Sequence, residues 1–208
     1  MKIVIYGAPG AGKGSQADQL VERYHIPHIS TGDILRKNIK EQTEVGKQAQ
    51  GFIERGELVP DEIIMELVKN RLAEKDCEAG FLFDGFPRNL FQAQQLDAIA
   101  PVDAVINLDV QLEKIMHRLT GRRTCAKCGQ PYHIDTLNGK TVCEKCGGEL
   151  IQRADDTEAT VSNRLKVYAD SCEPLLAFYR NKGVLYEVDA NGSIADVFEK
   201  ITEILDRL

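Results

Sequence analysis

Signals for export or membrane insertion are the first features that the sequence lacks. The apolar run at residues 3–6 ends at Gly7, far short of the hydrophobic segment of a signal peptide. No stretch reaches the roughly 18 apolar residues that a membrane span requires. We therefore expect a cytoplasmic protein in a reducing compartment, with no membrane partner.

Excess positive charge is also absent. The 26 Lys and Arg residues face 32 Asp and Glu residues, which leaves a net charge of −6. This balance disfavours a nucleic-acid surface over the whole chain but allows a local basic cleft that binds anions. With 208 residues, 43% of them hydrophobic, the chain can bury one core, and inserted lobes are favoured over two independent domains.

The pattern of the cysteines matters more than their number. In a reducing compartment, the six cysteines indicate metal ligands or free thiols before disulfides. Cys77 and Cys172 stand alone and are expected to be small buried hydrophobic residues. The other four form two closely spaced pairs within residues 125–146.

Five short, largely apolar runs are typical of buried parallel strands: residues 2–6, 28–30, 81–83, 104–108 and 184–188. Helical patterns separate them, and the first covers residues 13–24. The alternation predicts an α/β fold, a three-layer sandwich in which helices cover both faces of a five-stranded parallel sheet. Ligands of such folds bind at the carboxyl ends of the strands.

Two stretches interrupt this alternation. About thirty polar, helix-prone residues lie between Ser30 and Asp61 and predict a small helical lobe. Residues 121–156 replace any helical period with glycines, cysteines and polar residues, so this second lobe needs another source of order. Beyond it, residues 158–181 predict a long helix that Pro174 kinks or divides, and residues 194–208 predict a closing amphipathic helix.

The segment from Gly7 to Lys13 follows the first strand and opens a helix, as a phosphate-binding P-loop does. Glycines let backbone N–H groups turn toward phosphate oxygens, the helix N-terminus adds positive charge, and the lysine reaches the terminal phosphates. Gly14 follows Lys13 and the hydroxyl comes only at Ser15, which makes a direct bond from Ser15 to magnesium less secure. Asp84 ends an apolar strand and is expected to approach Mg²⁺, directly or through water.

Three sequence blocks resemble the adenylate kinase family: residues 7–15, Ser-Thr-Gly-Asp-Ile-Leu-Arg at residues 30–36 and Asp-Gly-Phe-Pro-Arg at residues 84–88. The similarity runs essentially end to end and includes Gly-Arg-Arg at residues 121–123 and Arg-Ala-Asp-Asp at residues 153–156. It implies reversible phosphoryl transfer from ATP, held with Mg²⁺, to AMP, which gives two ADP and serves adenine nucleotide homeostasis and AMP salvage. We expect a monomer, because two lobes must swing freely.

The resemblance also implies roles for individual residues. The ATP site would contain Gly10, Ala11, Gly12, Lys13, Gly14, Ser15, Arg118, Arg122, Tyr132 and Gly192. The AMP site would contain Thr31, Arg36, Glu57, Leu58, Val59, Gly85, Phe86, Pro87, Arg88, Gln92, Arg153 and Arg164. Catalysis by direct in-line transfer would use Lys13, Arg88, Arg122, Arg153 and Arg164, with no side-chain base, because an AMP phosphate oxygen is already anionic.

The same resemblance divides the chain into three parts. The P-loop core would comprise residues 1–29, 60–120 and 157–208, the AMP-binding lobe residues 30–59, and the lid residues 121–156. Both lobes must close to exclude water, since ATP would otherwise be hydrolysed.

The cysteine pairs of the lid are Cys125-x-x-Cys128 and Cys143-x-x-Cys146, separated by fourteen residues as in four-cysteine zinc ribbons. They predict a structural Zn²⁺ site, because four thiolates leave no open position for substrate or water. Disulfides are disfavoured by the compartment, and iron is an alternative metal. His117 and His133 flank the pairs and are not expected to be ligands of this site. The resemblance agrees, since some adenylate kinases carry a zinc-bearing lid.

Two alternatives remain open. A UMP, CMP or GMP kinase would use the same phosphate cradle, because the choice of base rests on the resemblance alone. A nucleic-acid-binding protein with a zinc ribbon and a switch-like P-loop is the second, since basic residues surround the lid at Arg122, Arg123, Lys127, Lys140 and Lys145. The acidic chain and the lack of lid aromatics other than Tyr132 disfavour it.

Overall fold

The computed structural model describes the backbone of residues 1–208 and every side chain except that of Leu112. At its centre lies a five-stranded sheet in the order β2-β3-β1-β4-β8, and every neighbouring pair is parallel. The predicted five-stranded parallel sheet is therefore confirmed, with each strand ending within one residue of its predicted bounds. The strands are β1 (Lys2–Gly7), β2 (His28–Ser30), β3 (Phe81–Asp84), β4 (Ala104–Asp109) and β8 (Leu185–Asp189).

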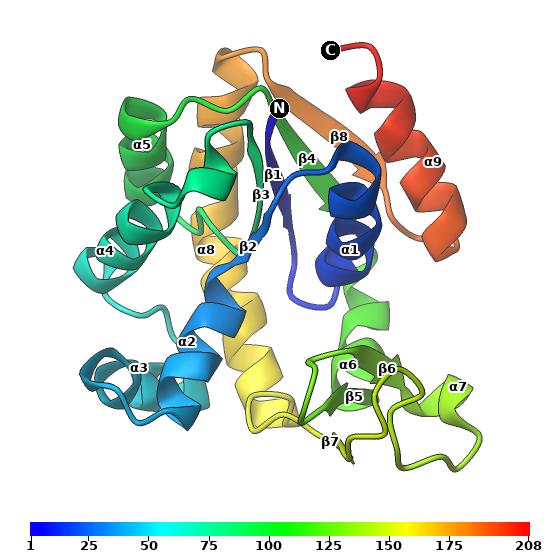
Figure 1. Ribbon diagram of the computed structural model, residues 1–208. Coiled ribbons are helices and arrows are strands. Elements are labelled where there is room, and N and C mark those ends of the chain that lie inside the picture. Colours follow the sequence, from blue (N-terminus) through cyan, green and yellow to red (C-terminus); the bar gives the residue numbers. More distant parts are fainter.

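Side chains of β1 alternate between two buried cores, as the pleat of a strand requires. Ile3 and Ile5 pack with α1, α6 and α9, whereas Val4 and Tyr6 pack with α4, α5 and α8. Helices thus cover both faces of the sheet, and Figure 1 shows the resulting three layers. The bounds are α1 (Lys13–Tyr24), α4 (Asp61–Leu72), α5 (Leu90–Ile99), α6 (Leu112–Thr120), α8 (Glu158–Asn181) and α9 (Ile194–Leu205), with a short 3-10 helix η1 (Lys75–Cys77) before β3.

The first inserted segment, residues 30–59, is helical, as its composition predicts. Its helices are α2 (Thr31–Lys40) and α3 (Glu44–Arg55), which begin at the hydroxyl caps of Ser30 and Thr43. Glycine is needed at position 46, because a Cβ on Gly46 would lie 2.2 Å from the carbonyl oxygen of Asn38. The close approach of these two helices makes the segment a compact unit.

The second inserted segment, residues 121–156, is built from short antiparallel strands that the sequence did not predict. Strands β5 (Arg122–Cys125), β6 (Pro131–His133) and β7 (Leu150–Ile151) pair in the order β6-β5-β7, and a one-turn helix, α7 (Ile134–Leu137), follows β6. This small sheet with its cysteine turns is the expected zinc-ribbon-like lid. Figure 1 shows the lid and the α2–α3 segment at the same end of the central sheet, where the strands have their carboxyl ends.

Helix α8 excludes one of the two predicted effects of Pro174, which were a kink and a division of the helix. Pro174 lies inside it, yet the helix is not divided and runs without a break from Glu158 to Asn181. Buried Leu175, Leu176 and Tyr179 hold the part after the proline against the core, which outweighs the hydrogen bond that the proline removes. None of the helices in the described residues combines the length and the hydropathy of a membrane span.

Candidate functional site

The glycine-rich loop between β1 and α1 has the conformation that a phosphate cradle requires. Gly7, Gly10 and Gly12 have φ angles of 140°, 81° and 97°, which only glycine adopts readily. Lys13 folds back over the loop, and its Nζ donates hydrogen bonds to the carbonyl oxygens of Gly7 (2.8 Å) and Ala8 (2.9 Å). The predicted ATP residues from Gly10 to Ser15 thus form one loop and the first turn of α1.

Asp84 and Lys13 bring opposite charges together beside this loop. Asp84 ends β3, which pairs with β1, and a Cβ on Gly14 would lie 3.7 Å from its Oδ2. Burial lowers the pKa of Lys13 to about 8, although the charge of Asp84 acts to raise it. Burial would raise the pKa of Asp84, but His28 and Lys13 outweigh it and lower that pKa. An ionised carboxylate next to the lysine of this glycine-rich loop has the chemistry of a magnesium ligand.

A pocket lies between the α2–α3 segment and the central sheet. Most of the residues predicted to hold AMP line it, and several others join them. The lining residues are Thr31, Gly32, Leu35, Arg36, Ile53, Gly56, Glu57, Leu58, Val59, Ile64, Gly85, Arg88, Gln92, Asp155 and Arg164. Three predicted residues do not line the pocket, namely Phe86, Pro87 and Arg153. Phe86 is buried and packs on Phe83.

Hydrogen bonds fix the floor of this pocket. The carbonyl oxygen of Gly85 accepts from Thr31 Oγ1 (2.9 Å) and from Arg88 Nε (2.7 Å). Gln92 is 1% exposed, and its Oε1 accepts from the backbone N–H of Arg88 at 2.8 Å. Its Nε2 donates to Asp61 Oδ1 at 2.7 Å, so both ends of the amide are held. A buried amide with both ends bonded has one orientation, which keeps this side of the pocket preorganised.

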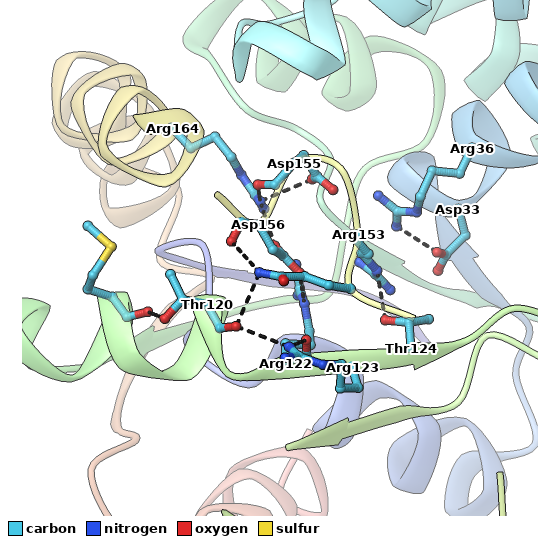
Figure 2. Close-up of polar contacts among 12 residues, drawn as sticks. Asp33, Arg36, Thr120, Arg122, Arg123, Thr124, Arg153, Asp155, Asp156 and Arg164 are labelled. Atoms are coloured by element: carbon cyan, nitrogen blue, oxygen red, sulfur yellow. Dashed lines mark hydrogen bonds and ion pairs between the residues drawn. The ribbon is translucent and has the colours of Figure 1, made fainter. Parts of the chain in front are cut away.

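Arginines gather where the lid meets α8 (Figure 2). Asp156 is fully buried and accepts two hydrogen bonds from Arg122, at 2.8 Å and 2.5 Å. The same carboxylate accepts from Arg164 Nη1 at 3.3 Å, and Asp155 lies 3.0 Å from that nitrogen. Arg153 donates to Thr124 Oγ1 at 3.0 Å. Asp156 therefore joins the beginning of the lid to α8.

Positive charge exceeds negative charge at this junction. Burial, followed by the charge of Arg164, lowers the pKa of Arg88 to about 10. Burial, followed by the charge of Arg36, lowers the pKa of Arg153 to about 10. Cations whose pKa is lowered by neighbouring cations favour an anionic ligand. The cluster can therefore hold phosphate groups between the P-loop and the pocket.

The remaining predicted residues lie farther toward the lid and α9. Arg118 is half-buried on α6, and Gly192 lies in the loop before α9. The hydroxyl of Tyr132 lies 3.2 Å from Cys143 Sγ and accepts from the backbone N–H of Glu144 at 3.0 Å, so its polar end faces the cysteine cluster.

Sequence reasoning missed the acids that hold the cations. Asp155 and Asp156 were noticed only as part of a family block, yet they pair with Arg122 and Arg164. Two adjacent acids that follow a lid arginine after one alanine are the signal that could have suggested this role. His28, whose Nε2 lies 3.8 Å from Asp84 Oδ2, left no signal of its own in the sequence.

The four cysteines of the lid come together. Their Sγ atoms all lie within 4.8 Å of one another, with 3.5 Å between Cys125 and Cys146 and 3.6 Å between Cys128 and Cys143. Zinc–sulfur bonds of about 2.3 Å in a tetrahedron separate the sulfurs by about 3.8 Å, so the donor set fits Zn²⁺. All six cysteines are free, which sets the disulfide alternative aside. The cluster is compatible with a structural metal.

Comparisons with known proteins agree with this geometry. Residues 5–184 match the family model described as adenylate kinase. A protein of Thermodesulfovibrio yellowstonii named adenylate kinase is 50% identical over 216 residues, covering 100% of both chains. Proteins with the same name from Clostridium tetani (49% identical, 99% of this chain and 98% of the relative) and Staphylococcus aureus (49% identical, 100% of both) are similarly related.

Proposed function

Because this chain belongs to the adenylate kinase family, we propose that it catalyses the reversible reaction ATP + AMP = 2 ADP. One observation carries the proposal. Lys13, Arg88, Arg153 and Arg164 are cations between the P-loop and the pocket beside α2, and burial together with the charge of neighbouring arginines lowers the pKa of each. Two nucleotides whose phosphate chains meet there would supply the missing negative charge.

The transfer is direct and in line. In the transition state, the transferred phosphoryl group resembles metaphosphate. It needs positioning and charge stabilisation more than it needs a protein nucleophile. Lys13 neutralises charge on the ATP side, while Arg88 orients the AMP phosphate, whose own anionic oxygen attacks. Arg122, Arg153 and Arg164 stabilise the charge shared between the two chains. Mg²⁺, held near Asp84 directly or through water, would neutralise phosphate oxygens of ATP.

We assign the two inserted segments to substrate closure. Residues 30–59 form the AMP-binding lobe, residues 121–156 form the lid, and residues 1–29, 60–120 and 157–208 form the core. The pocket joins residues of all three parts, since Thr31 belongs to the lobe, Asp155 to the lid and Arg164 to the core. Closure of both parts over the nucleotides excludes water, which would otherwise compete with AMP for the phosphoryl group.

Structural Zn²⁺ in the four-cysteine cluster is the second part of the proposal. Bound there, it would cross-link the two cysteine turns and order the lid without taking part in the transfer. Metal analysis of the purified protein distinguishes zinc from iron.

We also propose a cytoplasmic monomer with no nucleic-acid or membrane partner. Four free thiolate ligands need a reducing compartment, and the net charge of −6 opposes binding to polyanions. Light scattering of the purified protein tests the monomer, and a salt-dependent affinity for oligonucleotides would contradict the second part.

A coupled assay tests the activity itself. Purified protein with ATP and Mg²⁺ is offered AMP, UMP, CMP and GMP in parallel, and nucleoside diphosphate is measured. Selective turnover of AMP is expected. Preferred turnover of another monophosphate would transfer the assignment to that base, and a trapped phosphorylated enzyme would overturn direct transfer.

A further inference from the structure

A second group of potential metal ligands lies outside the four-cysteine cluster. It consists of His117 on α6, His133 at the end of β6 and Asp135 on α7. Asp135 Oδ2 lies 2.8 Å from His117 Nε2 and 3.2 Å from His133 Nδ1. The two imidazole rings meet edge to face, with 5.1 Å between their centroids. Three donor atoms from two parts of the chain thus converge on one point.

The hydrogen bonds of His133 decide which ring nitrogen faces this point. Its Nε2 lies 3.2 Å from the carbonyl oxygen of His117, which can only accept, so Nε2 carries the hydrogen. Its Nδ1 carries no hydrogen, and its single lone pair accepts the backbone N–H of Asp135 at 3.3 Å, a long hydrogen bond that a metal ion would replace. That lone pair and the Asp135 carboxylate face each other across 3.2 Å with no hydrogen between them. Two such acceptors at that distance favour a cation between them.

The arrangement matches how proteins prepare histidine for a metal. A metal-binding imidazole almost always donates its other N–H to a carbonyl or a carboxylate, which fixes the tautomer and the ring. Ligand bonds of about 2.0–2.1 Å at tetrahedral or octahedral angles place neighbouring ligand atoms about 2.9–3.4 Å apart. The two measured separations, 2.8 Å and 3.2 Å, are close to this range.

We propose that His117, His133 and Asp135 form a site for a divalent transition-metal ion such as Ni²⁺ or Zn²⁺, separate from the four-cysteine cluster. Two imidazoles and one carboxylate suit these ions better than they suit Mg²⁺. The side chains of His117 and Asp135 are 63% and 57% exposed, so an ion reaches them from solvent and water completes its coordination.

Such an ion would join two parts that the proposed closure moves relative to each other. Helix α6 is anchored in the core through buried Ile115 and Leu119, whereas His133 and Asp135 belong to the lid. An ion held by all three ligands therefore restrains the lid at its hinge and slows turnover. This consequence rests on the proposed kinase activity, whereas metal binding itself does not.

Calorimetric titration with Ni²⁺ tests the site. The protein carries no histidine tag, its cysteine cluster is first filled with zinc, and metal analysis confirms that the zinc stays bound. One equivalent of Ni²⁺ is expected to bind the unchanged protein, and H117Q is expected to weaken that binding by at least about tenfold. The matched control is H25N, which removes an exposed histidine directly after the last residue of α1.

His117 is exposed, so H117Q should fold, and its melting temperature verifies this. D135N is the second variant and should weaken Ni²⁺ binding as well. Failure of the unchanged protein to bind Ni²⁺, or equal binding by the protein and by H117Q, would overturn the site.

The second measurement is the turnover rate of the enzyme in the presence of Ni²⁺. With Mg²⁺ in excess, saturating Ni²⁺ should slow the unchanged enzyme and H25N several-fold but leave H117Q unaffected. Binding without any change in turnover would overturn the restraint on the lid. An inactive protein would refute the proposed function while the calorimetric result still decides the metal site.

Discussion

The central sheet and the lid are ordered by different physical forces. In β1, Ile3, Val4 and Ile5 are at most 1% exposed and pack on helices from both sides. Among the described side chains of the lid, Leu137 is the one buried residue that is aliphatic, and the other buried side chains are two cysteines and polar groups. Hydrophobic burial orders the sheet, whereas ligands and charge pairs must order the lid.

This difference separates stability from chemistry. The sheet tolerates the cost of a half-buried lysine at its carboxyl end because its apolar cores supply the stability. The lid has little apolar surface to bury, so its Arg122 is oriented by Asp156 and its turns by the cysteine cluster. Changes at the P-loop should therefore affect the reaction, and changes in the lid should affect both order and reaction.

The largest effect is expected from K13M. Removal of the cation should lower kcat/KM by about 10³-fold, because a half-buried charge near the transferred phosphoryl group is lost. The melting temperature should stay the same or rise, since burial disfavours the charged lysine. Steady-state kinetics and thermal melting measure both, and K75M, at an exposed lysine, is the control. A large fall in melting temperature would contradict the expectation that changes at the P-loop affect the reaction and not the stability.

Asp156→Asn should have the next largest effect. It leaves Arg122 and Arg164, whose side chains are 19% and 20% exposed, without the buried carboxylate that they share. Loss of one partner from a buried ion pair costs about 3 kcal/mol, and a chain of this length then melts roughly 6–12 °C lower. D206N removes an exposed partner of Arg23 and should change the melting temperature little. Equal shifts in the two variants would contradict the role of Asp156.

Metal removal should act on the lid alone. Chelation is expected to lower the free energy of unfolding by about 2–3 kcal/mol, the contribution of a ligand present well above its dissociation constant. Hydrogen exchange should speed up in residues 121–156 and stay slow in β1. Metal analysis must confirm the loss, and an unchanged melting temperature after that loss would refute a stabilising metal.

The smallest effect concerns pH. Lys13 has a pKa of about 8, so kcat/KM should fall about tenfold per pH unit above pH 8 as the lysine loses its charge. Stability should change in the opposite direction. Between about pH 8 and 10.5 the unfolded chain binds the proton that the folded chain has released, so the contribution of Lys13 to stability rises with pH. K13M should lack this contribution. The same dependence of melting temperature on pH in K13M and in the unchanged protein would contradict it.

Much of the fold could be predicted because most of the central strands are largely apolar runs, and four of the five end in glycine or an acid. Their order in the sheet could not, since β2 and β3 are neighbours although fifty residues separate their ends. The lid strands escaped prediction because a segment such as Arg-Arg-Thr-Cys of β5 has no alternating apolar pattern. Its pairing depends on the turns at the cysteines.

The candidate site shows the same limit. The P-loop and the four-cysteine spacing are local patterns, and the structure brings each set together. The shared partner of Arg122 and Arg164 depends on where the chain returns from the lid, which no local pattern encodes. The roles of Tyr132 and Gly192 toward the base of ATP stay predictions.

The bond between Arg122 and Asp156 also bears on how this architecture can diversify. The lid leaves the core and returns to it through residues that touch each other, so its two attachment points lie side by side and form one joint. Lengthening, shortening or exchanging everything beyond that joint would leave the two attachment points in place. The lid is thus an insertion that can be exchanged as a unit. A descendant of this chain could replace its cysteines with another means of cross-linking without changes in the central sheet.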